Sequence, residues 1–263
     1  MKHLDLFSGI GGFALAARWV GIETVQFVEI EPFAQKVLNK NFPNIPIHDD
    51  IKTFKADEFS GIGIITGGYP CQPFSQAGKR RGEEDDRHLW PAMFEIIRSC
   101  RPDWVLAENV AGHVSMGLDE VLSDLESEDY TCQPLIVPAC AVDAPHRRDR
   151  VWIVADSTGK RPYRLQPKER VFQKKNQNSS KFSHCYRSNG GKNEGRILWE
   201  NNTTICRVGD GIPSRVDRLR GLGNAIVPQV AYEIINAMIE AEYGRMTIRE
   251  YLQTVKRKYA KAD

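Results

Sequence analysis

The feature that most limits the fold is the alternation of strand-like and helical segments over the first 155 residues. Apolar, β-branched runs of strand length are followed by segments whose apolar residues recur every three or four positions. The strand-like runs are 2–7, 24–30, 61–66, 103–107, 133–141 and 150–155, and the helical segments are 13–20, 32–39, 90–100 and 118–127. Alternating elements of this kind predict a mainly parallel sheet with helices on both faces.

The alternation stops after Asp156, and the pattern resumes only near the end of the sequence. Residues 157–205 are polar and basic, whereas apolar residues at helical spacing return over 228–243, with Pro228 suited to the first turn of a helix. We therefore predict one α/β domain formed by residues 1–156 and 206–263. Residues 157–205 are then a small insert in that domain.

Size and composition suit a globular protein. The chain has 263 residues, of which 41% are hydrophobic and 27% charged, enough for a substantial core. Its apolar stretches are shorter than the roughly 18 residues of a membrane span, and it opens in a strand pattern, so we expect neither a membrane segment nor a signal peptide. The six cysteines contain no Cys-x-x-Cys pair. We therefore expect no disulfide scaffold, no metal site and a cytoplasmic location.

A net charge of +2 conceals a strong asymmetry along the chain. Residues 157–220 hold 15 Lys or Arg against 5 Asp or Glu, whereas the remainder holds 21 basic and 29 acidic residues. An acidic body with one basic segment suggests a polyanion partner that is met by a dedicated region. The alternative is a solvated insert without a core, because residues 173–193 are rich in Lys, Asn, Ser and Gly. Composition alone supports both interpretations.

A cysteine between two prolines follows one of the predicted strands. The run 62–66 and the pair Gly67-Gly68 lead into Pro70-Cys71-Gln72-Pro73-Phe74-Ser75. Reacting groups in open α/β sheets usually lie at such strand ends, which favours Cys71 as a nucleophile. The alternative is a small apolar filler in the core. Residues 78–87, with glycines and charges of both signs, have the composition of a surface loop that closes over a substrate.

The first turn and the ends of two later segments predict a nucleoside site. Glycines in Asp5-Leu6-Phe7-Ser8-Gly9-Ile10-Gly11-Gly12 permit a tight turn and a close ligand, but their spacing does not indicate NAD. Glu29 can accept hydrogen bonds from both ribose hydroxyls, and Asp50 can accept one from an adenine amino group. Both acids are otherwise surface carboxylates or helix caps. Together with the first turn, they form an adenosine-binding set.

Two further motifs carry groups suited to a reacting ring. Glu108 emerges from the apolar run 103–107, where partial desolvation raises a pKa and suits the carboxyl to share a proton. Residues 147–150, Arg-Arg-Asp-Arg, precede the next strand, and arginine forks bind phosphate or carbonyl oxygens. A helix cap for Glu108 and a solvated strand entrance for the arginines are the alternatives.

Taken in order, these motifs resemble the DNA cytosine C5-methyltransferase family. The resemblance rests on the first turn, Pro70-Cys71-Gln72-Pro73-Phe74-Ser75, Glu108-Asn109-Val110, Arg147-Arg148-Asp149-Arg150 and Arg218-Leu219-Arg220-Gly221-Leu222-Gly223-Asn224-Ala225. It covers about residues 2–155 and 211–241. The family implies a class I, Rossmann-like methyltransferase fold with a doubly wound, mostly parallel sheet. It also implies that the insert 157–205 is the target recognition region.

The resemblance assigns a role to individual residues. It implies that Cys71 attacks C6 of cytosine, that Glu108 engages N3 and the exocyclic amine, and that Arg150, supported by Arg148, holds the base oxygen. The positions that match the binding site for S-adenosyl-L-methionine are Phe7, Ser8, Gly9, Gly11, Gly12, Glu29, Ile30, Asp50, Ile51, Pro70, Asn224 and Ala225. The expected DNA contacts are Ser75, Arg80 and Arg87 in the loop region and Lys174, Lys175 and Lys181 in the basic insert.

The expected function follows from these roles. It is methyl transfer from S-adenosyl-L-methionine to C5 of a flipped-out cytosine in double-stranded DNA, in restriction–modification or in phage or host DNA protection. We expect a monomer without an obligate protein partner. The alternatives are a tRNA cytosine C5-methyltransferase and a catalytically silent DNA-binding homologue. The presence of Cys71, Glu108 and Arg150 together favours an enzyme.

Overall fold

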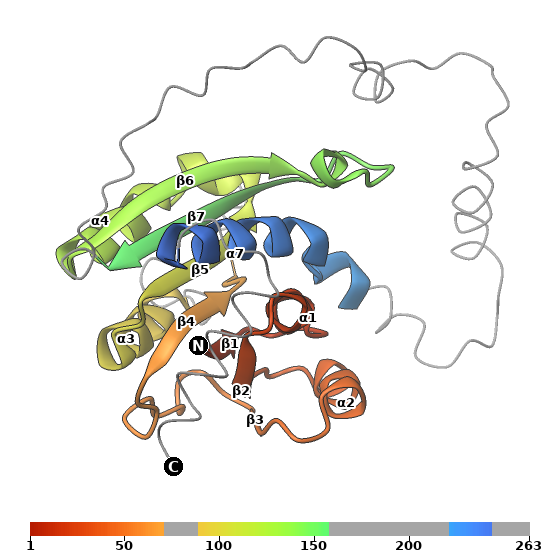
Figure 1. Cartoon of the computed structure of the whole chain (residues 1–263), viewed down its shortest axis with the longest axis vertical. Helices are drawn as coiled ribbons and strands as arrows, with labels where there is room; N and C mark the ends of the chain where they lie inside the picture. Colours follow the sequence, from red (N-terminus) through yellow and green to blue (C-terminus); the bar gives the residue numbers. More distant parts are fainter. Residues whose placement is uncertain (71–88, 158–220, 244–263) are drawn as a thin grey trace, which may run out of the picture.

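The computed structural model describes residues 1–70, 89–157 and 221–243 (Figure 1). Its strands are β1 (Lys2–Leu6), β2 (Glu23–Val28), β3 (Ile47–His48), β4 (Ile62–Gly67), β5 (Trp104–Val110), β6 (Tyr130–Pro138) and β7 (Asp149–Ser157). Its α-helices are α1 (Gly12–Trp19), α2 (Pro32–Asn41), α3 (Trp90–Cys100), α4 (Leu118–Ser127) and α7 (Pro228–Tyr243), with short 3-10 turns η1 (Ala111–Ser115) and η2 (Ala139–Val142).

The strands form one seven-stranded sheet in the order β3-β2-β1-β4-β5-β7-β6. All neighbours are parallel except β7, which runs antiparallel to both β5 and β6. This confirms the predicted mostly parallel, doubly wound sheet. The strand order changes direction between β1 and β4, and in such sheets ligands bind in the crevice beyond the carboxyl ends of the strands at that point.

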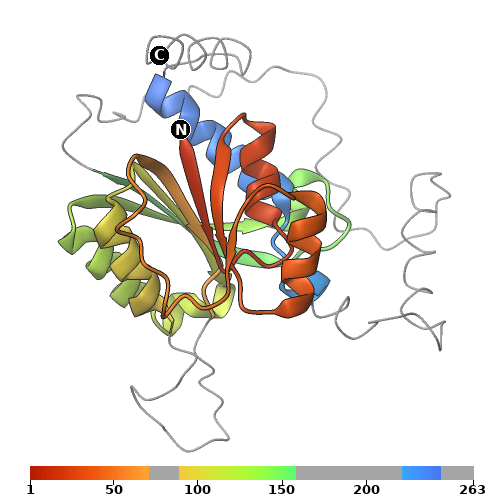
Figure 2. The ribbon, with the colours of Figure 1, turned by 90° about the horizontal axis from the view of Figure 1, so that it is seen from below.

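Helices cover both faces of the sheet (Figure 2). On one face, α3 and α4 pack their apolar side chains, among them Met93, Ile97 and Leu125, against Leu4, Leu6 and other strand residues. On the other face, α1 and α7 pack together over Trp104, Leu106 and Trp152. The sheet is therefore the middle layer of a three-layer sandwich.

The largest differences from the predicted ranges lie in β5 and β6, whose ends are set by pairing with β7. β5 continues past Ala107, since Glu108, Asn109 and Val110 pair with Trp152, Val151 and Arg150. β6 starts at Tyr130, which is buried and pairs with Ser157, and it ends at Pro138. Residues 139–141, predicted as strand, instead lie in η2. Here the amide of Ala139 bonds to the carbonyl of Arg147 at 2.6 Å and turns the chain back.

The predicted insert 157–205 lies, except for Ser157, outside the described residues, so its boundaries stay a prediction. Residues 206–220 and 244–263 of the predicted main domain lie outside them as well. In the parts of the chain that the structure does describe, no helix combines the length and apolar character needed to cross a bilayer.

Candidate active site

The turn between β1 and α1 forms one wall of the candidate site. Phe7, Gly9 and Gly11 have positive φ angles of 52°, 53° and 89°, which turn the chain sharply from the strand into the helix. The Ser8 hydroxyl donates to the Asp5 carbonyl at 2.7 Å and stabilises this turn. A Cβ added to Gly9 would meet nothing within 4 Å, so the space above this residue is open.

Glu29 links this turn to the end of β2. One carboxylate oxygen accepts the Gly9 amide at 2.6 Å, and the other accepts the Glu31 amide at 2.7 Å. Burial raises the pKa of Glu29, and these two amides act in the opposite direction. The next side chain, Ile30, is 68% exposed. A buried carboxylate, an exposed apolar side chain and the open space over Gly9 together fit a ribose and a flat apolar ring.

The third predicted group lies after β3, at the same edge of the sheet. Asp50 is half-buried, and its Oδ1 accepts the Lys52 amide at 2.9 Å, whereas Ile51 is buried in the core. Because β1, β2 and β3 are adjacent and parallel, their carboxyl ends bring Gly9, Glu29 and Asp50 to one side of the sheet. The structure thus groups the cofactor residues that were predicted from three separate segments.

A segment close to the end of the sequence completes this wall. The Nη2 atom of Arg148 donates to the carbonyls of Gly223 at 2.8 Å and Ala225 at 2.7 Å. A Cβ on Gly12 would lie 2.6 Å from Cγ1 of Ile226, so only glycine lets this segment approach α1. Asn224 and Ala225 are therefore brought to the first turn. Arg148, predicted as an active-site arginine, holds their backbone.

A buried ion pair forms the opposite side of the site. Glu108 on β5 is 8% exposed, and its Oε1 lies 2.9 Å from Nε of Arg150 on β7. Burial raises the pKa of Glu108 to about 7, although Arg150 and Arg148 lower it. A Cβ on Gly68 would lie 3.5 Å from Oε2 of Glu108, so the carboxyl lies over the end of β4. Glu108 can therefore hold or release a proton near neutral pH.

The chain leaving β4 is held by residues to which the sequence analysis assigned no role. Nδ2 of Asn109 donates to the Tyr69 carbonyl at 3.1 Å, and the Tyr69 hydroxyl lies 2.7 Å from Nε2 of His113. Asn109 directly follows Glu108 in the sequence, and this adjacency could have indicated that Asn109 lies near the site. Nothing local marked Tyr69 or His113, since their contact joins residues 44 positions apart.

Several predicted site residues lie outside the described part of the chain. Pro70, the last residue described before this gap, is exposed. The residues beyond description are Cys71, Ser75, Arg80, Arg87, Lys174, Lys175 and Lys181. Their roles stay predictions.

A buried polar chain supports the first turn from within the sheet. The Thr66 hydroxyl donates to Oδ1 of Asp5 at 2.8 Å, so its oxygen accepts from Nε2 of His3 at 2.7 Å. Nδ1 of His3 then accepts from the Thr24 hydroxyl at 2.9 Å. Burial lowers the pKa of His3 to about 3 and raises that of Asp5 well above its usual range. His3 is therefore neutral near pH 7, and this chain is structural support for the first turn.

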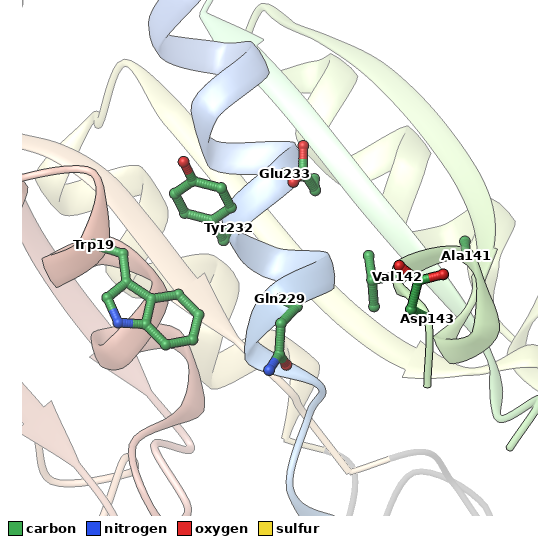
Figure 3. Close-up of a pocket in the computed structure, with 7 residues that line it drawn as sticks. All are labelled: Trp19, Ala141, Val142, Asp143, Gln229, Tyr232 and Glu233. Carbon is green, nitrogen blue, oxygen red and sulfur yellow. The ribbon is translucent and has the colours of Figure 1, made fainter. Parts of the chain in front are cut away.

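A separate hollow of about 710 Å³ lies on the face covered by α1 and α7 (Figure 3). Its lining residues are Trp19, Ala141, Val142, Asp143, Gln229, Tyr232 and Glu233. Trp19 and Tyr232 meet edge to face, with ring centroids 6.0 Å apart. None of the predicted site residues lines this hollow, so it is distinct from the candidate active site.

The strand order, with a reversed β7 beside β5, is that of the class I methyltransferase fold. The sequence model of C-5 cytosine-specific DNA methylases matches residues 1–205. The chain therefore belongs to the C-5 cytosine-specific DNA methylase family, as the motifs predicted.

Individual relatives agree with this assignment. The type II methyltransferase M2.BsuMI of Bacillus subtilis strain 168 is 38% identical over 167 residues, which cover 59% of this chain and 42% of that protein. M.CviJI of Paramecium bursaria Chlorella virus IL3A is 31% identical over 237 residues, or 88% of this chain and 58% of that protein. The crystal structure of the S. pombe Dnmt2 methyltransferase has a TM-score of 0.54 and 27% identity, covering 62% of this chain and 53% of that one. The chain thus spans about half the length of the relatives it matches.

Proposed function

We propose that this protein transfers a methyl group from S-adenosyl-L-methionine to C5 of a cytosine in double-stranded DNA. The observation that carries the proposal is the Glu108–Arg150 pair. It lies over the end of the strand that leads to Cys71, and Glu108 has a pKa of about 7. An acid that holds its proton near neutral pH beside a fixed guanidinium suits the activation of a pyrimidine ring. Family membership supports the same substrate.

Each step has a group assigned to it. The thiolate of Cys71 adds to C6, and Glu108 donates a proton to N3 so that C5 becomes nucleophilic. Arg150 donates to the base oxygen and, paired with Glu108, keeps the acid in place. After methylation, a base removes the C5 proton, the C5–C6 double bond re-forms as the Cys71 thiolate leaves, and the N3 proton returns to Glu108.

The wall opposite Glu108 fits the cofactor. We assign Glu29 to the ribose hydroxyls, the exposed Ile30 to the face of the adenine ring and Asp50 to its amino group. The other proposed positions are Phe7, Ser8, Gly9, Gly11, Gly12, Ile51, Pro70, Asn224 and Ala225. When bound, the cofactor supplies an electrophilic methyl group on its sulfonium. The residues of this wall would hold it.

The substrate contacts are proposed from the sequence. C5 and C6 are shielded inside a duplex, so the target base has to be flipped out of the stack. We assign contacts with DNA to Ser75, Arg80 and Arg87 and, in the recognition region 157–205, to Lys174, Lys175 and Lys181. A monomer acting in restriction–modification or DNA protection in the cytoplasm is the cellular role we propose.

The direct test measures methyl transfer from labelled cofactor to duplex DNA and, in parallel, to tRNA. We expect transfer to duplex DNA alone and no turnover by Cys71→Ser, whose cofactor Kd should stay within a few-fold of the wild-type value. A duplex carrying 5-fluorocytosine should trap a covalent adduct through residue 71, because fluorine cannot leave as a cation.

The remaining outcomes contradict the proposal in different ways. Transfer to tRNA alone would assign the substrate to the tRNA branch of the same chemistry. DNA binding without transfer or adduct would identify a silent homologue. Near-normal turnover by Cys71→Ser would refute the nucleophile assignment.

A further inference from the structure

One residue at the end of β4 is held at two points by the segment that carries Glu108. The backbone carbonyl of Tyr69 accepts from Asn109, and the Tyr69 hydroxyl contacts His113 at 2.7 Å. Asn109 lies at the end of β5 and His113 in η1, so both anchors belong to one continuous stretch. Tyr69 and His113 are 3% and 5% exposed, which excludes solvent from competing for this bond.

The surrounding packing leaves the Tyr69 ring little freedom. Its centroid lies 5.1 Å from that of Trp90, whose Nε1 donates to Asp124 on α4 at 2.7 Å. On the other side, a Cβ added to Gly117 would lie 3.1 Å from Cε1 of His113, so the imidazole is pressed under the start of α4. Burial lowers the pKa of His113 and keeps it neutral, which suits a hydrogen bond with a neutral phenol.

Tyr69 precedes Cys71 by two residues, and two extended residues span only about 7 Å. A carbonyl bond fixes the backbone at Tyr69, and a hydroxyl bond fixes the orientation of its ring. Together they set the direction in which the chain leaves β4, relative to the same segment that holds Glu108. The positions of Glu108 and of the start of the cysteine loop are therefore both set by the same segment of the chain.

We propose that Tyr69 and His113 are positioning residues, which orient the exit of the chain toward Cys71 so that its sulfur meets C6 while Glu108 reaches N3. The inference rests on the proposed function. Neither residue touches the base. Removing the bond should therefore slow formation of the Cys71–C6 bond and leave cofactor binding unchanged.

The experiment measures single-turnover adduct formation with a 5-fluorocytosine duplex at saturating cofactor. Tyr69→Phe and His113→Leu each remove the bond, and His113→Gln retains a nitrogen near the position of Nε2. A matched control is Tyr130→Phe, because Tyr130 is also buried and its hydroxyl donates to the Pro102 carbonyl at 2.8 Å, away from the site. Cofactor Kd and Tm are measured for every variant.

We expect Tyr69→Phe and His113→Leu to slow adduct formation by about 10- to 100-fold, the order of loss that a misplacement of about 1 Å produces. His113→Gln should recover most of the rate, the double variant should be no slower than His113→Leu, and cofactor Kd should stay within about 2-fold. Tyr130→Phe should lower Tm like Tyr69→Phe but form the adduct at the wild-type rate.

Two results would overturn the inference, and they are distinguishable. If the wild type forms an adduct and Tyr69→Phe and His113→Leu match its rate, or slow only as much as Tyr130→Phe, the positioning role is wrong and the proposed function stands. If the wild type itself forms no adduct, the proposed function fails and the inference fails with it. Should His113→Leu not fold, Tyr69→Phe, which keeps the ring, decides the outcome.

Discussion

Glu108 owes its chemistry to opposing contributions from its surroundings. Desolvation disfavours the carboxylate, whereas Arg150 at 2.9 Å and the more distant charge of Arg148 favour it. Desolvation is the larger contribution, so the pKa rises to about 7 from an ordinary value of 4.5. The ion pair therefore keeps the acid from being permanently protonated, and the group can exchange its proton at physiological pH.

Glu108→Gln should change how stability depends on pH. In the wild type, the unfolded chain releases the Glu108 proton near pH 4.5, but the folded protein keeps it until about pH 7. Between these values the unfolded state binds fewer protons, so this residue makes stability fall as pH rises. We expect the Tm of the wild type, relative to that of Glu108→Gln, to fall between pH 4.5 and 7 and to level off above. Parallel Tm curves for the two proteins would contradict the raised pKa.

The turn into α1 and the segment 221–227 show how elements distant in sequence share one surface. Residues 221–224 are helical, and the next residues reach the first turn because Arg148 binds two of their carbonyls and Gly12 has no side chain. This contact brings the segment that carries Asn224 and Ala225 against Gly12 at the start of α1. The wall proposed for the cofactor therefore depends on close backbone packing as much as on polar groups.

Gly12→Ala should disturb this contact. Its new methyl would overlap Ile226, whose Cγ1 would lie 2.6 Å away, and we expect a loss of about 1–3 kcal/mol and weaker cofactor binding. Gly223→Ala is the matched control for stability, since its methyl would enter open space with nothing within 4 Å. Thermal unfolding and a cofactor titration check both variants. If Gly12→Ala is as stable as Gly223→Ala, the close approach of Ile226 is refuted. Adding Ile226→Ala should restore part of the loss.

Across the described parts of the molecule, the parallel strands place their carboxyl ends at one edge, where Gly9, Glu29, Asp50 and Glu108 lie. The charge is distributed differently, because the acidic residues predominate outside 157–220 and the basic ones within it. A polyanion is then attracted to residues 157–220 and repelled by much of the remaining chain. This arrangement would orient DNA before any base is read.

Replacing Lys174, Lys175 and Lys181 together with glutamine should weaken DNA binding and flatten its salt dependence. Each phosphate contact that is lost lowers the slope of log K against log salt by about 0.9, so a decrease of about 2 to 3 is expected. Fluorescence anisotropy with a labelled duplex at several salt concentrations measures it. The triple variant at the exposed Lys36, Lys40 and Lys55 removes the same charge outside the insert and should keep the slope. An unchanged slope in the first variant would show that its lysines do not contact DNA.

Local patterns in the sequence were sufficient for the alternating elements and for placing several candidate residues at the ends of strands. Apolar periodicity, turn glycines and strand-end acids act over a few residues, so Gly9, Glu29, Asp50 and Glu108 could be placed at strand ends without the fold. The ranges of β5 and β6 were less accurate, because their ends depend on pairing with β7. The sequence of a strand does not indicate how far the neighbouring strand extends alongside it.

Only the folded chain decided the contacts that join distant residues. The reversed β7 puts Arg150 beside Glu108, and burial at that point raises the acid's pKa. Arg148 turned out to hold the carbonyls of residues 223 and 225, and the Tyr69–His113 bond had no local signal. Solvent exclusion and hydrogen bonds between remote segments arise when strands assemble into a sheet. The residue types were therefore readable in advance, whereas their protonation and mutual orientation were set by tertiary packing.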